Sequence, residues 1–141
     1  MNRCIIDASV AVKWFFREEE LTEQALKLLN SGTGFVVPDF FYLEMYSVFA
    51  KLVRKRFLSP NDARRMHRAL NALPVDVLDV KRYRDLALEL SVERNIGFYD
   101  CLYVIPASIS EIPLVTADRR LYRAFKSTKL SSCVCWLGEH A

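Results

Sequence analysis

The sequence predicts an α/β domain with a mainly parallel central sheet of about four to five strands, covered by helices. Short apolar runs of strand length alternate along the chain with longer stretches whose apolar residues recur at helical spacing. Neither a repeat nor a Pro/Gly-rich linker interrupts this alternation. The 141 residues suit one domain, so we expect a single unit over residues 1–141.

The first half of the chain carries clear boundary signals. The expected elements are a strand at residues 3–6, a short helix reaching 16, a helix at about 19–30, a strand at 35–37, and a long helix to about 57. Ser9 can cap the first of these helices, and Asp39 can cap the long one. The run 31–34 ends the second helix because glycine accepts the left-handed conformation past a helix C-terminus. Pro38 closes the second strand.

The second half begins with a strong helix start at 59–62, where Ser59 is the N-cap and Pro60 fills the first turn. The expected elements are this helix to about 73, a strand at 75–78, helices at 81–94 and 98–108, a strand at 114–116, a helix at 118–125 and a last strand at 133–137. We expect Pro106 to bend or shorten its helix.

Charge and cysteine content restrict the function classes only mildly. The net charge of +3 is a slight preference for anionic partners, but the segment 51–68 is strongly basic. That segment is either a solvated helical face or a phosphate-binding surface.

The four cysteines form no C-x-x-C pair, which argues against a zinc knuckle. We expect the cysteines to be small buried side chains, and whether two of them form a disulfide stays open. No signal peptide or membrane-length apolar run is present, so we expect a cytoplasmic protein.

Four acidic residues stand in apolar surroundings, where carboxylates are rarely found without a partner. Asp7 follows Cys4-Ile5-Ile6, and Asp118 follows an apolar strand. Glu44 lies within the apolar run 40–49, and Asp100 is enclosed by aromatic and aliphatic neighbours. Each has an ordinary explanation: Asp7, Asp100 and Asp118 can cap helices, and Glu44 can pair with a buried cation.

Taken together, the four acids predict a metal site. Residues just past the carboxyl ends of parallel strands line the ligand crevice of an α/β sheet. Asp7 and Asp118 fall there, and Glu44 and Asp100 stand on early helical turns that can reach the same edge. Carboxylates about 4 Å apart repel by about 4 kcal/mol at an effective dielectric near 20. A hard divalent cation, Mg²⁺ or Mn²⁺, would relieve this repulsion.

These blocks carry a family resemblance. Residues 5–9, 38–44, 99–103 and 114–121 resemble, in order and spacing, the motifs of the PIN domain, most closely those of VapC-type toxins. The resemblance implies a PIN-like three-layer sandwich and a Mg²⁺- or Mn²⁺-dependent endoribonuclease, usually a homodimer, held inactive by a VapB-type antitoxin. It places Asp7, Glu44, Asp100 and Asp118 in the site, with Ser9 and Thr116 as supporting hydroxyls.

The resemblance is incomplete at positions 47 and 120. Ser47 stands where many members have Asn, and Arg120 stands where some carry a further acid. Whether the site holds one metal ion or two therefore stays open. We expect Asp7 and Asp118 to be direct ligands, Asp100 to be a ligand or to position water, and Glu44 to be a ligand or the base.

Two further groups of residues suggest contacts with larger partners. The first is a basic set expected to hold the RNA backbone, which comprises Lys51, Arg54, Lys55, Arg56 and Arg119. The second is the aromatic run Trp14, Phe15 and Phe16, which is either ordinary core packing or a surface for an antitoxin helix or a second copy.

Two other readings of the chain remain. A phosphoacceptor or phosphotransferase α/β domain also uses a strand-end Asp with Mg²⁺, but the run Asp7-Ala8-Ser9 lacks the second Asp of phosphotransferases. A catalytically silent RNA-binding module would not need all four acids. The only histidines, His67 and His140, are poorly placed for a Ser-His-Asp or Cys-His site.

Overall fold

The fold is built on one parallel sheet, which confirms the predicted α/β class. The structure is a computed structural model and describes residues 1–17 and 20–139. Within these residues, five strands pair in the order β3-β2-β1-β4-β5, and every pairing is parallel. The strands are β1 Arg3–Ile6, β2 Gly34–Pro38, β3 Val75–Leu78, β4 Leu114–Thr116 and β5 Val134–Trp136.

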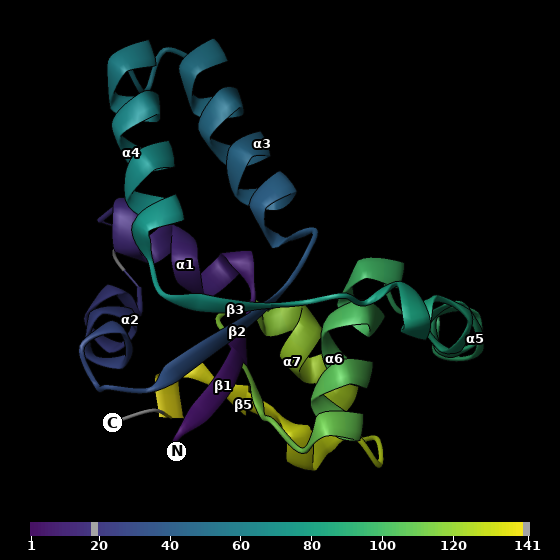
Figure 1. Ribbon diagram of the computed structural model, residues 1–141. Coiled ribbons are helices and arrows are strands. Elements are labelled where there is room, and N and C mark those ends of the chain that lie inside the picture. The colour runs from purple at the N-terminus through teal and green to yellow at the C-terminus, as the bar shows by residue number, and fades with distance from the viewer. Residues whose placement is uncertain (18–19, 140–141) are drawn as a thin grey trace.

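Helices cover both faces of this sheet (Figure 1). They are α1 Ala8–Phe15, α2 Thr22–Leu29, α3 Phe41–Arg54, α4 Pro60–Ala72, α5 Arg84–Arg94, α6 Phe98–Ser110 and α7 Arg119–Lys126. Short 3₁₀ turns occupy Lys81–Tyr83, Ser131–Cys133 and Leu137–Glu139. None of the helices in the described part of the chain has the length and apolar character needed to cross a lipid bilayer.

Alternating strand side chains divide the core into two layers. Cys4 and Ile6 of β1 pack in the cluster that contains residues of α1, α2, α3 and α4. Ile5, between them, packs in the cluster that contains residues of α5, α6 and α7. Because successive strand side chains point to opposite faces, the apolar run of β1 supplies both layers at once. This arrangement confirms the three-layer sandwich.

Helices α3 and α4 form a hairpin that stands away from the sheet, with its turn at the top of the view (Figure 1). Tyr46 of α3 accepts a hydrogen bond from the Asn71 side chain of α4 at 2.7 Å, and its ring lies edge-on to His67 at 5.1 Å. Ser59 caps α4 as predicted, because its hydroxyl accepts the Asp62 N–H at 3.0 Å.

Two predicted helix caps are wrong. Asp7, not Ser9, is the N-cap of α1, because its carboxylate accepts the Val10 N–H while the Ser9 hydroxyl donates to Asp7. Asp39 does not cap α3, which begins at Phe41 without a side-chain cap. The Asp39 N–H instead donates to the Leu78 carbonyl at 3.0 Å, so this residue extends the contact between β2 and β3.

Several boundaries also differ from the expected ones. Pro106 does not shorten α6, which runs on to Ser110. Residues 101–107 of that helix are all buried, and packing on every side offsets the roughly 3 kcal/mol that an interior proline costs. Helix α2 begins at Thr22; the predicted start at Glu19 lies outside the described residues. The last strand covers only residues 134–136.

The question of a disulfide is answered by the structure, in which all four cysteines are free thiols.

Candidate active site

Asp7 and Asp118 lie at the same edge of the sheet because they follow the neighbouring parallel strands β1 and β4. Each carboxylate also begins a helix. Asp7 Oδ1 accepts the Val10 N–H at 3.3 Å, and Asp118 Oδ1 accepts the N–H groups of Arg120 and Leu121 at 2.9 and 3.3 Å. The predicted capping roles of both acids are therefore confirmed, and their position at the sheet edge is confirmed as well.

Two hydroxyl groups join these acids in one network. Ser9 Oγ donates to Asp7 Oδ1 at 2.5 Å, and Thr116 Oγ1 donates to Asp7 Oδ2 at 2.5 Å. The Asp118 N–H in turn donates to Thr116 Oγ1 at 3.1 Å, and the Ala117 N–H donates to Ser9 Oγ at 2.9 Å. Ser9 and Thr116 thus fix the position of the Asp7 carboxylate relative to β4.

Glu44 and Asp100 reach this edge from opposite layers of the fold. Glu44 is in the first turn of α3, and Asp100 is in the first turn of α6. The Tyr103 hydroxyl, one turn beyond Asp100 on α6, donates to Glu44 Oε1 at 2.5 Å. This hydrogen bond ties α3 to α6 and keeps Glu44 beside Asp100.

Burial and mutual repulsion make several of these carboxylates less acidic. Burial raises the pKa of Asp7 to about 6. Its hydrogen bonds act in the opposite direction and lower the pKa, whereas the charge of Asp118 raises it further. Burial also raises the pKa of Glu44, and the neighbouring Asp100 adds to this. The pKa of Asp100 is raised by burial and then by Asp118, while Arg120 lowers it. Because each acid is coupled to another, the four predicted residues form one electrostatic cluster.

A cleft of about 400 Å³ opens beside this cluster. Glu44 stands in its wall, and the rest of the lining is mostly apolar, with Phe40, Leu43, Val48 and Tyr99. Phe40 packs edge-on to Tyr99 and Tyr103, both at 5.1 Å between ring centroids. The cleft therefore gives a ligand access to Glu44 from the α3 side.

Comparison with known proteins assigns the family. The PIN domain model matches residues 4–126, which include all four acids. This chain belongs to the PIN domain family. Its members are generally nucleases and usually use divalent metals. A search of curated proteins finds no significant match.

Solved structures show the same PIN fold. The protein PAE2754 from Pyrobaculum aerophilum is 22% identical, covers 96% of this chain and 84% of its own, and superposes with a TM-score of 0.73. A toxin–antitoxin complex from Klebsiella pneumoniae matches at 13% identity, 94% and 95% coverage, and a TM-score of 0.65. VapBC2 from Rickettsia felis, bound to a promoter DNA fragment, matches at 16% identity, 95% and 98% coverage, and a TM-score of 0.65. At these identities the comparison shows the fold alone.

The donor set of this PIN domain has the chemistry of a site for a hard cation. All four candidate ligands are carboxylates, which suit Mg²⁺ or Mn²⁺. In the described residues, however, no three His, Cys, Asp or Glu side chains are grouped closely enough to hold an ion as they stand. Each acid has its own protein partner instead: hydroxyls for Asp7, helix N–H groups for Asp118, Tyr103 for Glu44, and a long ion pair for Asp100. Binding an ion would require these side chains to turn toward one another.

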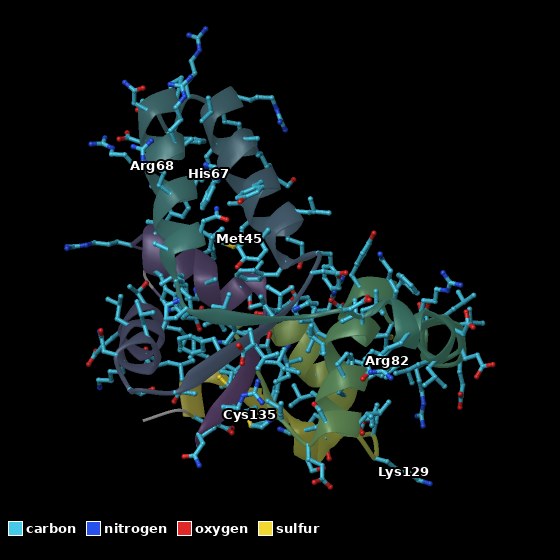
Figure 2. All side chains as sticks on the ribbon, in the orientation of Figure 1. Met45, His67, Arg68, Arg82, Lys129 and Cys135 are labelled. Atoms are coloured by element: carbon cyan, nitrogen blue, oxygen red, sulfur yellow. The ribbon has the colours of Figure 1, made fainter. Side chains whose placement is uncertain are left out.

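The predicted basic set divides into two separate surfaces. Lys51, Arg54, Lys55 and Arg56 are exposed at the far end of α3 and just beyond it. Glu44 and Arg54 are ten residues apart on one helix, which places their Cα atoms about 15 Å apart along its axis. Arg119 lies instead beside Asp118 at the start of α7. Figure 2 shows His67 and Arg68 on the same α3–α4 hairpin as the first surface.

The aromatic run on α1 is largely accounted for by packing within the chain. The Trp14 indole donates to the Ala25 carbonyl at 2.9 Å. Phe15 and Phe16 pack edge-on to Phe49, at 5.5 and 6.2 Å between ring centroids. All three rings are partly exposed, so a role in partner binding stays a prediction.

Two neighbours of the four acids are residues to which the sequence patterns gave no role. Tyr103 contacts Glu44, and the Arg120 guanidinium lies 3.9 Å from Asp100 Oδ2. The spacing of Asp100 and Tyr103 on one helix face is a signal for the first. No sequence signal points to the second, because the contact joins α7 to α6.

Proposed function

We propose that this PIN domain is a Mg²⁺- or Mn²⁺-dependent endoribonuclease that hydrolyses RNA phosphodiester bonds. The observation that carries the proposal is the coupled carboxylate cluster of Asp7, Glu44, Asp100 and Asp118 at the carboxyl edge of β1 and β4. Family membership supports phosphodiester hydrolysis over the phosphoacceptor alternative.

The cation would be held by Asp7 and Asp118, with Asp100 and Glu44 completing or supporting the ligand set. When bound, such an ion lowers the pKa of a coordinated water and polarises the phosphoryl oxygen. Ser9 and Thr116 keep the Asp7 carboxylate oriented, and the α7 N–H groups do the same for Asp118.

Glu44 is the best placed acid to accept the proton of the attacking water. Its raised pKa brings it closer to the working pH, which favours proton transfer, and the cleft leaves it accessible. Tyr103 holds its Oε1, so Oε2 is the oxygen available to the water. Asp100 either shares the cation or positions that water.

We further propose that the chain is the toxin of a VapBC-type pair. Two solved structures of the same fold are a toxin–antitoxin complex and VapBC2. A VapB-type antitoxin and a second copy of this chain are the proposed partners, and the partly exposed rings of Trp14, Phe15 and Phe16 are a candidate contact. The basic end of the α3–α4 hairpin is the proposed surface for the RNA backbone.

The direct test is RNA cleavage by the purified chain with Mg²⁺, with Mn²⁺ and with EDTA. We expect cleavage with either ion and none with EDTA. Asp7→Asn should lower the cleavage rate by on the order of 100-fold or more, because it removes one charged ligand of the cluster. Asp85→Asn is the matched control, since Asp85 is an exposed acid on α5.

Two results would overturn the proposal. One is equal cleavage with EDTA and with Mg²⁺. The other is normal Mg²⁺-dependent cleavage by Asp7→Asn, which would show that the carboxylate cluster is not the site. RNA binding without cleavage under any metal condition would instead support a catalytically silent module.

A further inference from the structure

A small pocket lined by basic and aromatic residues lies between α7 and β5. Its volume is about 180 Å³, and its lining consists of Arg119, Tyr122, Arg123, Lys126 and Trp136. None of the described lining residues is acidic. The carboxylate site described above does not use this pocket.

The sequence of α7 produces the pocket through its helical spacing. Positions 119, 122, 123 and 126 fall on one face of the helix, because residues three and four apart are neighbours on a helix surface. The opposite face carries the buried residues Leu121 and Phe125, which fix α7 against the sheet. The polar face is therefore held toward Trp136 and solvent.

The rings and cations of the pocket already contact one another. Tyr122 and Trp136 lie 5.6 Å apart between ring centroids, tilted by 42°. The Arg119 guanidinium lies over the Trp136 ring at 5.2 Å, and Lys126 lies over Tyr122 at 5.9 Å. An ion pair between Arg119 and Glu20 holds that guanidinium in place. Flat stacking surfaces and positive charge are thus combined in one small space.

The pocket is next to the carboxylate cluster. Trp136 is the register partner of Thr116 on the adjacent strand, and neighbouring strands lie about 4.8 Å apart. Thr116 donates directly to Asp7, and Arg119 follows Asp118 in the chain. A strand of nucleic acid lying across the acids therefore meets the pocket with an adjoining nucleotide.

We propose that this pocket binds one nucleotide of single-stranded RNA next to the scissile bond. The proposal rests on the proposed nuclease function. The base packs against Trp136, Tyr122 and the Arg119 guanidinium, and Arg123 and Lys126 contact the phosphate. Aromatic platforms combined with cations are how proteins bind single strands, since every base has a flat face and every link a negative charge.

The size and charge of the pocket favour this ligand. It is smaller than the roughly 300 to 1,000 Å³ of sites that enclose a whole small molecule, so it suits one planar ring of a longer chain. An acidic peptide would satisfy the cations but would leave the Tyr122 and Trp136 ring surfaces without a planar partner.

Tryptophan fluorescence tests the stacking directly, because the chain has only two tryptophans, Trp14 and Trp136. Trp14→Phe leaves Trp136 as the single reporter. In EDTA, where the proposed reaction does not proceed, a single-stranded RNA of about ten nucleotides should quench this variant saturably. Trp136→Phe keeps Trp14 as the reporter and should show no saturable quenching. Inorganic polyphosphate, which lacks bases, should not quench either variant.

The salt dependence of binding tests the phosphate contacts. Arg123→Gln combined with Lys126→Gln should weaken RNA binding about tenfold at low salt. The slope of log affinity against log salt should fall by between about one and two, since each phosphate contact contributes about 0.7. Arg82→Gln combined with Arg84→Gln is the matched control, because both are exposed basic residues outside the lining of the pocket.

The outcomes separate this proposal from the nuclease proposal. Mg²⁺-dependent cleavage by the wild type, without quenching of Trp136, would overturn the pocket and leave the nuclease standing. Quenching of Trp136 without any cleavage would support the pocket and contradict the nuclease. Equal quenching by RNA and by polyglutamate, or an equal loss of affinity in the control pair, would also overturn the pocket.

Discussion

In the absence of divalent metal, Asp7→Asn should make the protein more stable at neutral pH. The Asp7 carboxylate is 5% exposed, and its pKa is raised from 3.8 to about 6. A carboxyl whose pKa lies about two above its unfolded value costs the folded state about 3 kcal/mol once the pH exceeds both values. The cause is burial of a charge that its hydrogen bonds only partly compensate.

The sign of the pH dependence follows from the same numbers. Between about pH 4 and pH 6, the folded protein holds a proton on Asp7 that the unfolded chain has released. Stability of the wild type therefore falls as the pH rises through this window and is lowest, from this group, above about pH 6. Asparagine carries no charge, so the variant lacks this fall.

Some of the gain is lost to altered hydrogen bonds. Asparagine is as good an N-cap as aspartate, so the bond from the Val10 N–H is kept. However, Ser9 and Thr116 both donate to the carboxylate, and the amide NH₂ group can satisfy one of them only if that hydroxyl turns to accept. With about 1 kcal/mol lost there, the net gain is about 1 to 2 kcal/mol above about pH 7.

The assay is urea unfolding in EDTA at several pH values, for the wild type, Asp7→Asn and Asp62→Asn. Asp62 is the control because its pKa is lowered, first by Ser59 and then by Arg65. Its stabilising contribution is present above its unfolded pKa and is lost as the pH falls, which is the opposite sign. An Asp7→Asn variant less stable than the wild type at neutral pH, with the same pH dependence, would refute the reasoning.

Two further variants test the contacts around the cluster. Tyr103→Phe removes the hydroxyl that donates to Glu44 but keeps the ring, so the pKa of Glu44 should rise. The acidic limb of the pH–rate profile of RNA cleavage should then move to higher pH. The control Tyr83→Phe should leave this limb unmoved, and an unmoved limb in Tyr103→Phe would contradict the positioning role of Tyr103. Arg120→Gln removes the exposed cation that lies 3.9 Å from Asp100 and would compete with Mg²⁺ for this carboxylate. Half-maximal cleavage should therefore need about two- to fivefold less Mg²⁺. An unchanged or higher Mg²⁺ requirement would show that Arg120 does not compete with the ion.

The strands and most helices could be predicted because local sequence determines them. Strands β1, β2 and β4 are short, mostly apolar runs that the sheet buries on both faces. The edge strand β3 is different, because it contains Asp76 and is only partly buried. The helix of α4 was predicted from its start at Ser59, where the capping interaction is local. That residues 1–141 act as one domain stays a prediction.

The wrong caps show where local signals are insufficient. Ser9 and Asp7 are both good N-cap residues, and the choice between them depends on Thr116, which is 109 residues from Asp7 and holds its carboxylate. Asp39 has the right side chain for a cap, but its backbone N–H bonds to Leu78 across the sheet. In both cases a contact between distant segments decides the local structure.

The four acids could be found from the sequence because apolar neighbours make a carboxylate conspicuous. The helical spacing could place Tyr103 on the same face as Asp100, but its contact with Glu44 and the Arg120–Asp100 contact depend on how the helices pack. The basic residues show a related difficulty. Positive charge can be counted along a sequence, but only the fold shows that Arg119 lies over Trp136 and that Arg54 stands at the far end of the hairpin.

The burial of Asp7 connects stability with the proposed activity. A carboxylate that costs the folded chain free energy when charged gains more from a nearby cation than a solvated carboxylate does, because less water screens the attraction. A ligand that binds only the folded state stabilises it by an amount that grows with the logarithm of that affinity. The hydrogen bonds from Ser9 and Thr116 then keep the charge in place at the sheet edge. Substitutions that remove this buried charge are therefore expected to stabilise the chain and to remove the proposed cation affinity together, which would oppose stability and the proposed activity at this position.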